Sequence, residues 1–213
     1  MAHGRTTARP ACALDRGAFA LSLATLAVAV VLLAAADWGT RLAGDSVIPG
    51  GPLDELAHLL TALIVFWALS SRARERFLVP ALIASVAIDV DHIPDRLGVD
   101  WLTVGTPRPY THSLLMIVVV VAAAVTWRRR REVLLGVALG LGIHFFRDMG
   151  EGGSGVSLLW PFSYHSFQYP HGVYLAAMAV FVLVDVAVCA PRWRQWALSR
   201  ARWRPRAPQS ESV

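Results

Sequence analysis

The chain has 213 residues, of which 55% are hydrophobic and 16% are charged. Ordinary soluble domains carry about 25% charged residues, so the composition excludes a typical soluble globular protein and a disordered chain. The formal net charge is +5, and all 20 basic residues are arginines. Because these arginines lie between long apolar runs, a membrane explains them better than a nucleic acid does, and we expect no nucleic-acid partner.

Six apolar runs follow one another along the chain. The first, residues 17–36, carries no charge and is long enough to cross about 30 Å of hydrocarbon as a helix. Three of the others are short, and they reach about 17 residues only if polar residues at their ends continue the helix. The sequence therefore predicts an all-α, polytopic bundle of about six transmembrane helices with polar side chains facing its interior. The five later runs are residues 56–70, 77–88, 113–127, 133–146 and 173–190.

The arginines are distributed unequally between the two sides of such a bundle. Sixteen of the 20 fall in the N-terminal segment, in the C-terminal segment, and after the second and fourth runs. The positive-inside rule then predicts that both termini lie in the cytoplasm. We expect a cytoplasmic tail at residues 1–16, a membrane domain at 17–190 and a basic, Trp-rich cytoplasmic tail at 191–213. This last tail either lies on anionic lipids of the cytoplasmic leaflet or is a disordered basic segment.

The first run has a second interpretation. Ala34, Ala35 and Ala36 precede Asp37 and resemble a signal-peptidase site behind a basic N-terminal region. The apolar stretch is longer than a usual signal-peptide core, which favours a retained helix. Cleavage would leave five spans with the same orientation.

Acids and histidines gather on the side opposite the arginines. Ten acidic residues and six of the seven histidines are expected there, against four arginines. Clustered carboxylates repel one another and are costly near hydrocarbon unless they are protonated or neutralised. A bound metal cation would neutralise them, and imidazole with carboxylate is suitable ligand chemistry.

The spacing of these residues supports a metal site at the extracytoplasmic helix ends. His58 follows Asp54 by four residues, and Asp148 follows His144 by four, so each pair shares a helix face. A D-x-D-H-x-x-D segment ends the third run, and His112 opens the fourth. Taken singly, such pairs are more often capped or paired histidines, and the acidic segment is equally a helix end followed by a turn. Together they predict that a divalent metal, best zinc but also manganese or iron, is held by His58, Asp89, Asp91, His92, His112, His144 and Asp148.

With these motifs in place, the chain resembles the YdjM-type family of membrane-bound metal-dependent hydrolases. The matching pieces are Ala57-His58-Leu59, the segment SVAIDVDHIPD at 85–95, RPYTHS at 108–113, HFFRD at 144–148 and Leu159-Trp160-Pro161-Phe162. The resemblance covers about residues 54–165. It implies a small multi-pass protein of the bacterial inner membrane with hydrolase activity. The family often has His-Arg-Gly before Thr-His-Ser, whereas Arg108-Pro109-Tyr110 stands here.

The expected reaction is hydrolysis by a metal-activated water. Asp95 or Asp54 would serve as the general base, and Arg108 or Arg147 would hold an anionic phosphate. A site flush with the outer membrane surface suits an ester or phosphoester of a lipid or lipid-linked substrate. A loose similarity of ligand types to zinc-dependent phospholipases C also favours phosphoesters.

Two other functions are compatible with part of this pattern. A type 2 phosphatidic acid phosphatase shares the number of spans, but its lysine motif is absent because the chain has no lysine. The other alternative is a metal-binding or metal-transport membrane protein without hydrolase activity. Against transport, the acids are expected to stop at the outer ends of the spans.

Overall fold

The computed structural model describes residues 16–44, 46–151 and 153–201. In that part of the chain the fold is all-helical, as predicted, with one isolated antiparallel bridge between Val156 and Phe167 in the last long loop. Short helical segments supplement six long helices: the 3-10 turns η1 (Ile88–Asp91) and η2 (Arg128–Arg130) and the helix α4 (His92–Arg96). The long helices are α1 (Arg16–Ala43), α2 (Gly50–Ala68), α3 (Ser71–Ala87), α5 (Leu114–Thr126), α6 (Arg131–Gly150) and α7 (His171–Ala201).

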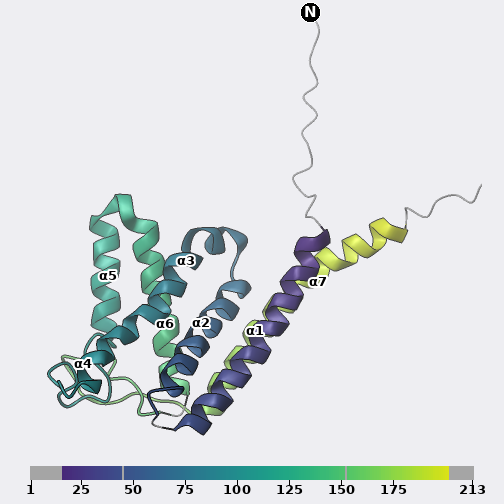
Figure 1. Ribbon diagram of the computed structural model, residues 1–213. Coiled ribbons are helices and arrows are strands. Elements are labelled where there is room, and N and C mark those ends of the chain that lie inside the picture. Colours follow the sequence, from purple (N-terminus) through teal and green to yellow (C-terminus); the bar gives the residue numbers. More distant parts are fainter. Residues whose placement is uncertain (1–15, 45, 152, 202–213) are drawn as a thin grey trace, which may run out of the picture.

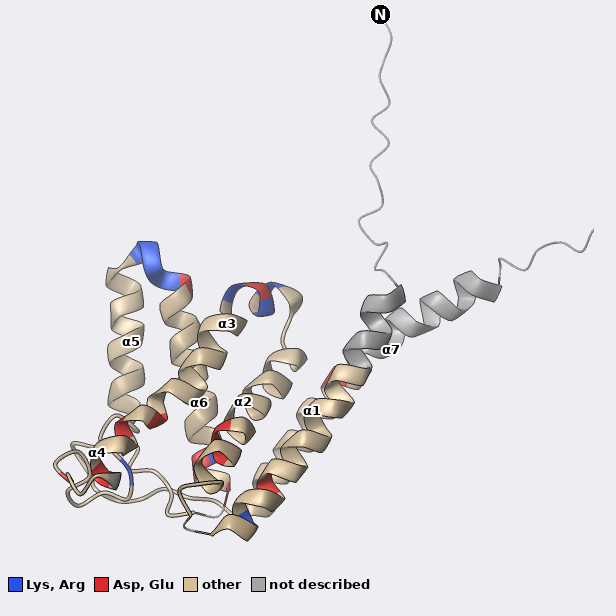
Figure 2. Ribbon diagram, in the orientation of Figure 1, with Lys and Arg blue, Asp and Glu red and all other residues tan. Residues whose placement is uncertain are grey.

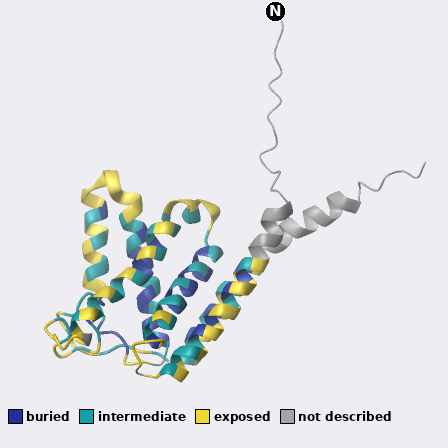
Figure 3. Ribbon diagram, in the orientation of Figure 1, coloured by how far each residue is buried: buried dark blue, intermediate teal, exposed yellow. Residues whose placement is uncertain are grey.

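The long helices run alternately in opposite directions, so that consecutive connections lie at opposite ends of the bundle (Figure 1). Four segments are long and apolar enough to cross a membrane, while α5 and the described apolar part of α7 are shorter apolar helices. Large apolar side chains such as Val118, Val125 and Leu183 are exposed on these shorter helices, which is the surface that a membrane helix offers to lipid (Figure 3). The four long segments are 24–43, 50–68, 71–95 and 128–150.

Helix α1 is longer than its apolar run and continues to Ala43, where Gly44 takes a left-handed conformation (φ 55°) that ends the helix. Residues 34–36, the alternative cleavage site, lie inside this helix. Ala36 is buried there, in a core that α1 shares with α2 and α7. Helix α1, which contains the first predicted span, therefore packs against α2 and α7 as part of the bundle. Buried members of this core are Leu26, Ala29, Leu33, Ala36, Ala57, Leu60, Ile64, Tyr174 and Met178.

A second contact brings the backbones of α3 and α6 close together. Gly136 and Gly140 of α6 face Pro80 and Ala81 of α3. A Cβ at Gly140 would lie 2.3 Å from the carbonyl oxygen of Ala81, so only glycine fits there. Small residues four apart let membrane helices approach in this way. The contact fixes α6, and with it His144 one turn further on, against the end of α3.

The two ends of the bundle differ in charge (Figure 2). Arginines gather at the α2–α3 and α5–α6 connections, and most acids gather at the opposite end. This is the segregation that the sequence predicted. Helix α7 continues to Ala201, so the first part of the expected tail at 191–213 is helical. Residues 1–15 and 202–213 of the two predicted tails lie outside the described residues.

Candidate metal centre

The acidic end of the bundle contains a buried group of histidines and carboxylates drawn from four parts of the chain. His58 comes from α2, Asp89 from η1, and His112 from the loop before α5, while His144 and Asp148 come from α6. The side chains of the three histidines and Asp148 are fully buried, and that of Asp89 is 11% exposed. Residues far apart in sequence thus form one polar cluster inside an otherwise apolar bundle.

The carboxylate of Asp148 lies between two sets of histidines. Its Oδ1 atom is 3.2 Å from Nε2 of His58. Its Oδ2 atom is 3.1 Å from Nε2 of His144 and 3.7 Å from Nε2 of His112. Neither oxygen accepts a hydrogen bond from another described residue. Buried carboxylate oxygens need such partners. Arg108, whose Nη1 lies 3.3 Å from Oδ2, meets part of this need, and the rest is available to a cation.

His144 shows which atoms are free to bind. Its Nδ1 lies 2.8 Å from the backbone carbonyl of Ser85. A carbonyl can only accept, so a proton sits on Nδ1, and Nε2 is the atom left to hold a second proton or to bind a cation. That atom is 3.1 Å from Nε2 of His112 and 3.4 Å from Oδ1 of Asp89. Lone pairs therefore converge on one point, which requires a proton or a metal cation between them.

His112 is supported from behind by a carboxylate. Its Nδ1 lies 3.4 Å from Oδ2 of Asp91, which also accepts a hydrogen bond from the hydroxyl of Thr111. Burial opposes the charged ring, but Asp89 and Asp91 raise the pKa of His112 above its ordinary value. A carboxylate on the second ring nitrogen is a common support for metal-binding histidines. Asp91 is thus placed either to bind a cation or to orient His112.

All seven residues predicted as metal ligands fall into groups whose ligand atoms lie within 4.8 Å of one another. His92 joins through its Nε2, 3.5 Å from Oδ1 of Asp89. The ring of His58 stacks on that of His144 with centroids 3.9 Å apart. The donor set of imidazoles and carboxylates fits zinc, manganese or iron. One group is Asp89, Asp91, His92 and His112; a second is His58, His144 and Asp148; a third is Asp54, His58 and Glu151.

The two candidate bases occupy different places. Asp54 lies at the edge of the cluster, where its Oδ2 is 3.9 Å from Nε2 of His58. Asp95 lies outside the groups of candidate ligands, and its exposed carboxylate accepts a hydrogen bond from Thr103 at 3.0 Å. Only Asp54 is therefore within reach of the cluster in this conformation.

Arg108 and Arg147 both bind carboxylates of the protein. Arg108 lies 3.3 Å from Asp148 and 2.6 Å from Glu151, and these acids raise its pKa in spite of burial. Arg147 is 2.8 Å from Asp37 and 3.2 Å from Asp54. Both guanidinium groups thus offset part of the negative charge of the cluster. Their expected role as phosphate ligands stays a prediction.

Several neighbours were not among the predicted site residues. Glu151 is half of an ion pair with Arg108, yet burial and the charge of Asp54 raise its pKa to about 8. Glu55 has a buried Oε2 without a hydrogen bond among the described residues. Glu151 could have been found from spacing, because it continues the face of His144 and Asp148 by one more turn. Local spacing gives no such signal for Asp37, which lies on α1.

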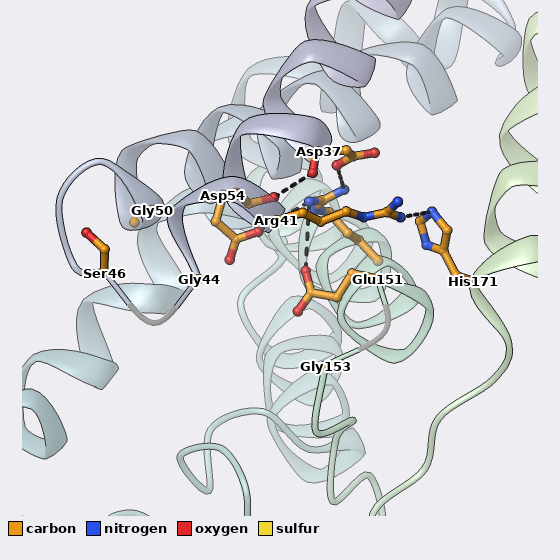
Figure 4. A pocket seen from close by; sticks show the side chains of 12 residues that line it. Asp37, Arg41, Gly44, Ser46, Gly50, Asp54, Glu151, Gly153 and His171 are labelled. Atoms are coloured by element: carbon orange, nitrogen blue, oxygen red, sulfur yellow. Dashed lines mark hydrogen bonds and ion pairs between the residues drawn. The ribbon is translucent and has the colours of Figure 1, made fainter.

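A cavity of about 530 Å³ adjoins the cluster (Figure 4). It lies where the end of α1, the start of α2 and the end of α6 meet, and Asp54 and Glu151 belong both to its wall and to the third ligand group. The cavity therefore gives access to the edge of the candidate metal centre. Its lining residues are Asp37, Thr40, Arg41, Gly44, Ser46, Gly50, Gly51, Asp54, Arg147, Glu151, Gly153 and His171.

The sequence also matches a known protein family. The family model described as YdjM inner membrane protein matches residues 53–203, which include every candidate ligand. The chain belongs to the YdjM inner membrane protein family. The resemblance seen in the sequence is thereby confirmed, and the apolar helices agree with a membrane location. The whole of α1 lies outside the matched region. No protein of curated function and no solved structure shows significant similarity to the chain.

Proposed function

We propose that this YdjM family member is a membrane-bound metal-dependent hydrolase. Its substrate would be an ester or phosphoester of a lipid or lipid-linked molecule. The observation that carries the proposal is the convergence of the Nε2 atoms of three buried histidines, His58, His112 and His144, on the carboxylate of Asp148 at 3.1–3.7 Å. Buried acceptors that face one another are stabilised by a cation.

The residues of the chain fit a divalent metal in both donor type and support. His144, His112 and Asp89 would hold it on one side of Asp148, and His58 on the other, which leaves Asp54 unligated at the edge. Ser85 and Asp91 would orient the two rings through their second nitrogens. A bound divalent cation supplies Lewis acidity to the ester and lowers the pKa of a water molecule.

The other steps belong to protein side chains. Asp54 is exposed enough, at 34% of its side chain, to accept a proton from water entering through the cavity. Arg108 and Arg147 keep the carboxylates of the site ionised and in place. The apolar bundle around the cluster keeps bulk water away from it, which strengthens every charge interaction inside.

We also propose that the acidic end faces away from the cytoplasm and that both termini are cytoplasmic. The support is the gathering of arginines at the opposite end of the bundle (Figure 2). In this orientation the cluster meets lipid head groups of the outer leaflet, so a lipid ester would reach it without leaving the bilayer.

Elemental analysis and a turnover assay, run on the same purified samples, test the proposal. The wild-type protein in mixed phospholipid vesicles should hold stoichiometric zinc, manganese or iron and should release a head group or acyl product. Asp148→Asn keeps the shape of the side chain but removes its charge, so both signals should fall by at least about tenfold. His165→Ala, a change in an exposed loop residue outside the ligand groups, should leave both unchanged.

Two results would overturn the proposal in different ways. A wild-type protein without a stoichiometric transition metal would remove its basis. Metal uptake into vesicles that depends on Asp148, without any lipid product, would replace the hydrolase with a metal transporter.

A further inference from the structure

The cavity beside the cluster contains one arginine that differs from all others near the site. Arg41 lies in the last turn of α1, and its side chain extends along the cavity to His171 at the start of α7 (Figure 4). Its Nη2 atom lies 2.6 Å from Nε2 of the His171 ring. Within the described residues, Arg41 forms no ion pair with a carboxylate. The nearby Arg147 binds Asp37 and Asp54.

The tautomer of His171 shows that its contact does not neutralise Arg41. The Nδ1 atom of His171 lies 2.9 Å from the carbonyl oxygen of Gly150, which fixes the proton on Nδ1. The Nε2 atom then accepts from the guanidinium as an uncharged group. Arg41 is therefore held in place by a neutral partner, and no carboxylate of the described residues pairs with it.

The other charged residues of the lining are three carboxylates, Asp37, Asp54 and Glu151, and one guanidinium, Arg147. Asp37 and Asp54 lie within ion-pair distance of Arg147, and Glu151 binds Arg108 at 2.6 Å. A divalent cation at the edge of the cavity, where Asp54 and Glu151 meet His58, would add further positive charge. With such a cation, Arg41 and Arg147 bring the positive charges of the lining to four against three carboxylates, so an anion fits the metal-loaded cavity.

We propose that this cavity binds the phosphate group of the substrate and that Arg41 contacts it. The inference rests in part on the proposed hydrolase, since it places the phosphate next to the candidate metal centre. A guanidinium matches the planar, multi-oxygen surface of a phosphate through paired N–H donors. Four glycines in the lining leave room for a group of this size.

The surroundings of the cavity favour a lipid as the source of the phosphate. Trp38 and Leu42 are exposed on α1, and Val47 and Ile48 are exposed in the loop that contributes Ser46 to the lining. Exposed tryptophan and aliphatic side chains at a helix end are typical of the level of lipid head groups. A lipid phosphate at this level would enter the cavity while its acyl chains stay in the bilayer.

Calorimetry with two soluble probes tests the inference on metal-loaded protein in detergent. The probes are dihexanoyl phosphatidic acid and inorganic phosphate. Arg41→Gln removes the charge and should weaken binding of phosphatidic acid by about tenfold or more, and Arg41→Lys should retain part of the affinity. Arg76→Gln, at the opposite end of the bundle, is the matched control and should bind as the wild type does.

The comparison of probes identifies the source of the phosphate. Tighter binding of phosphatidic acid than of inorganic phosphate supports a lipid, and equal binding lost in Arg41→Gln supports a soluble phosphate compound. Wild-type affinity in a folded Arg41→Gln protein, or no binding of either probe to the wild type, would overturn the inference. The metal content of the same samples separates the two proposals. If the protein holds metal but binding does not depend on Arg41, the anion site is wrong and the proposed hydrolase is unaffected. If binding depends on Arg41 but the protein holds no metal, the anion site is supported and the proposed hydrolase is wrong.

Discussion

Arginine serves opposite purposes at the two ends of this bundle. Arg76, at the α2–α3 connection, is 48% exposed and pairs at 3.4 Å with Glu132, which is 59% exposed. Arg147, at the acidic end, is 2% exposed and lies among Asp37, Asp54 and Tyr174. An exposed arginine such as Arg76 is solvated by water, and its position indicates one side of the membrane. Arg147 lies buried and offsets the charge of two partly exposed carboxylates, so arginine is solvated at one end of the bundle and part of a charge cluster at the other.

Labelling should separate the two ends completely. In a protein whose native Cys12 and Cys189 are replaced by serine, Asp100→Cys should react with an impermeant thiol reagent added outside cells, and Arg130→Cys should not. The reason is the predicted orientation with the arginine end in the cytoplasm. Reaction of the second cysteine alone would invert the topology and move the candidate metal centre to the cytoplasmic face.

Loss of a buried arginine should cost far more stability than loss of an exposed one. Arg147→Met leaves Asp37 and Asp54 without their cation, and removing one partner of a buried ion pair costs about 3–5 kcal/mol. The matched change Arg76→Met breaks an exposed pair, for which about 0–1 kcal/mol is typical. Unfolding of the detergent-solubilised variants, followed by circular dichroism, measures both. Equal losses would mean that the acidic end is as well hydrated as the arginine end.

A smaller effect should come from the helix contact that supports the acidic end. Gly140→Ala forces α6 away from the backbone of Ala81, and such overpacking costs about 1–3 kcal/mol. Gly142→Ala, two residues on, meets open space and should be neutral or slightly stabilising, since alanine favours helix. Thermal unfolding gives the sign of each change. Because His144 follows on the same helix, bound metal should fall in the first variant only; a fall in both would show that the α3–α6 contact does not control the site.

Local spacing predicted the contacts within a helix, and the shared side of the bundle predicted that candidate ligands from different helices gather, but neither gave the pairs of atoms between helices. His144 and Asp148, four residues apart, do face each other at 3.1 Å, and the run 113–127 is close to α5 (Leu114–Thr126). Helical periodicity determines both. Hydropathy predicted a span over residues 17–36, yet α1 continues to Ala43. The end of an apolar run indicates where a helix leaves the hydrocarbon of the membrane, and the helix itself can continue beyond that point.

The remaining contacts depend on the rotation of each helix about its own axis and on the path of the loops between helices. Asp95 belongs to the same motif as Asp89, but the chain turns through η1 and α4 and carries its carboxylate out to Thr103. Nothing in the sequence near Arg41 indicates that it meets His171, because that pairing depends on α1 and α7 packing together over their length. Long-range pairs of this kind need the tertiary structure.

The ion pair between Arg147 and Asp37 also has a consequence for how the protein is made. Asp37 is synthesised more than a hundred residues before Arg147. Helices α1 and α2 must therefore enter the bilayer while Asp37 and Asp54 have no guanidinium to bind. Both acids lie near helix ends, where water and head groups reach them, so early insertion is inexpensive. Once α6 is inserted, Arg147 can bind both acids and connect the ends of α1 and α2. The acidic end of the bundle is then assembled in the order in which its helices are translated.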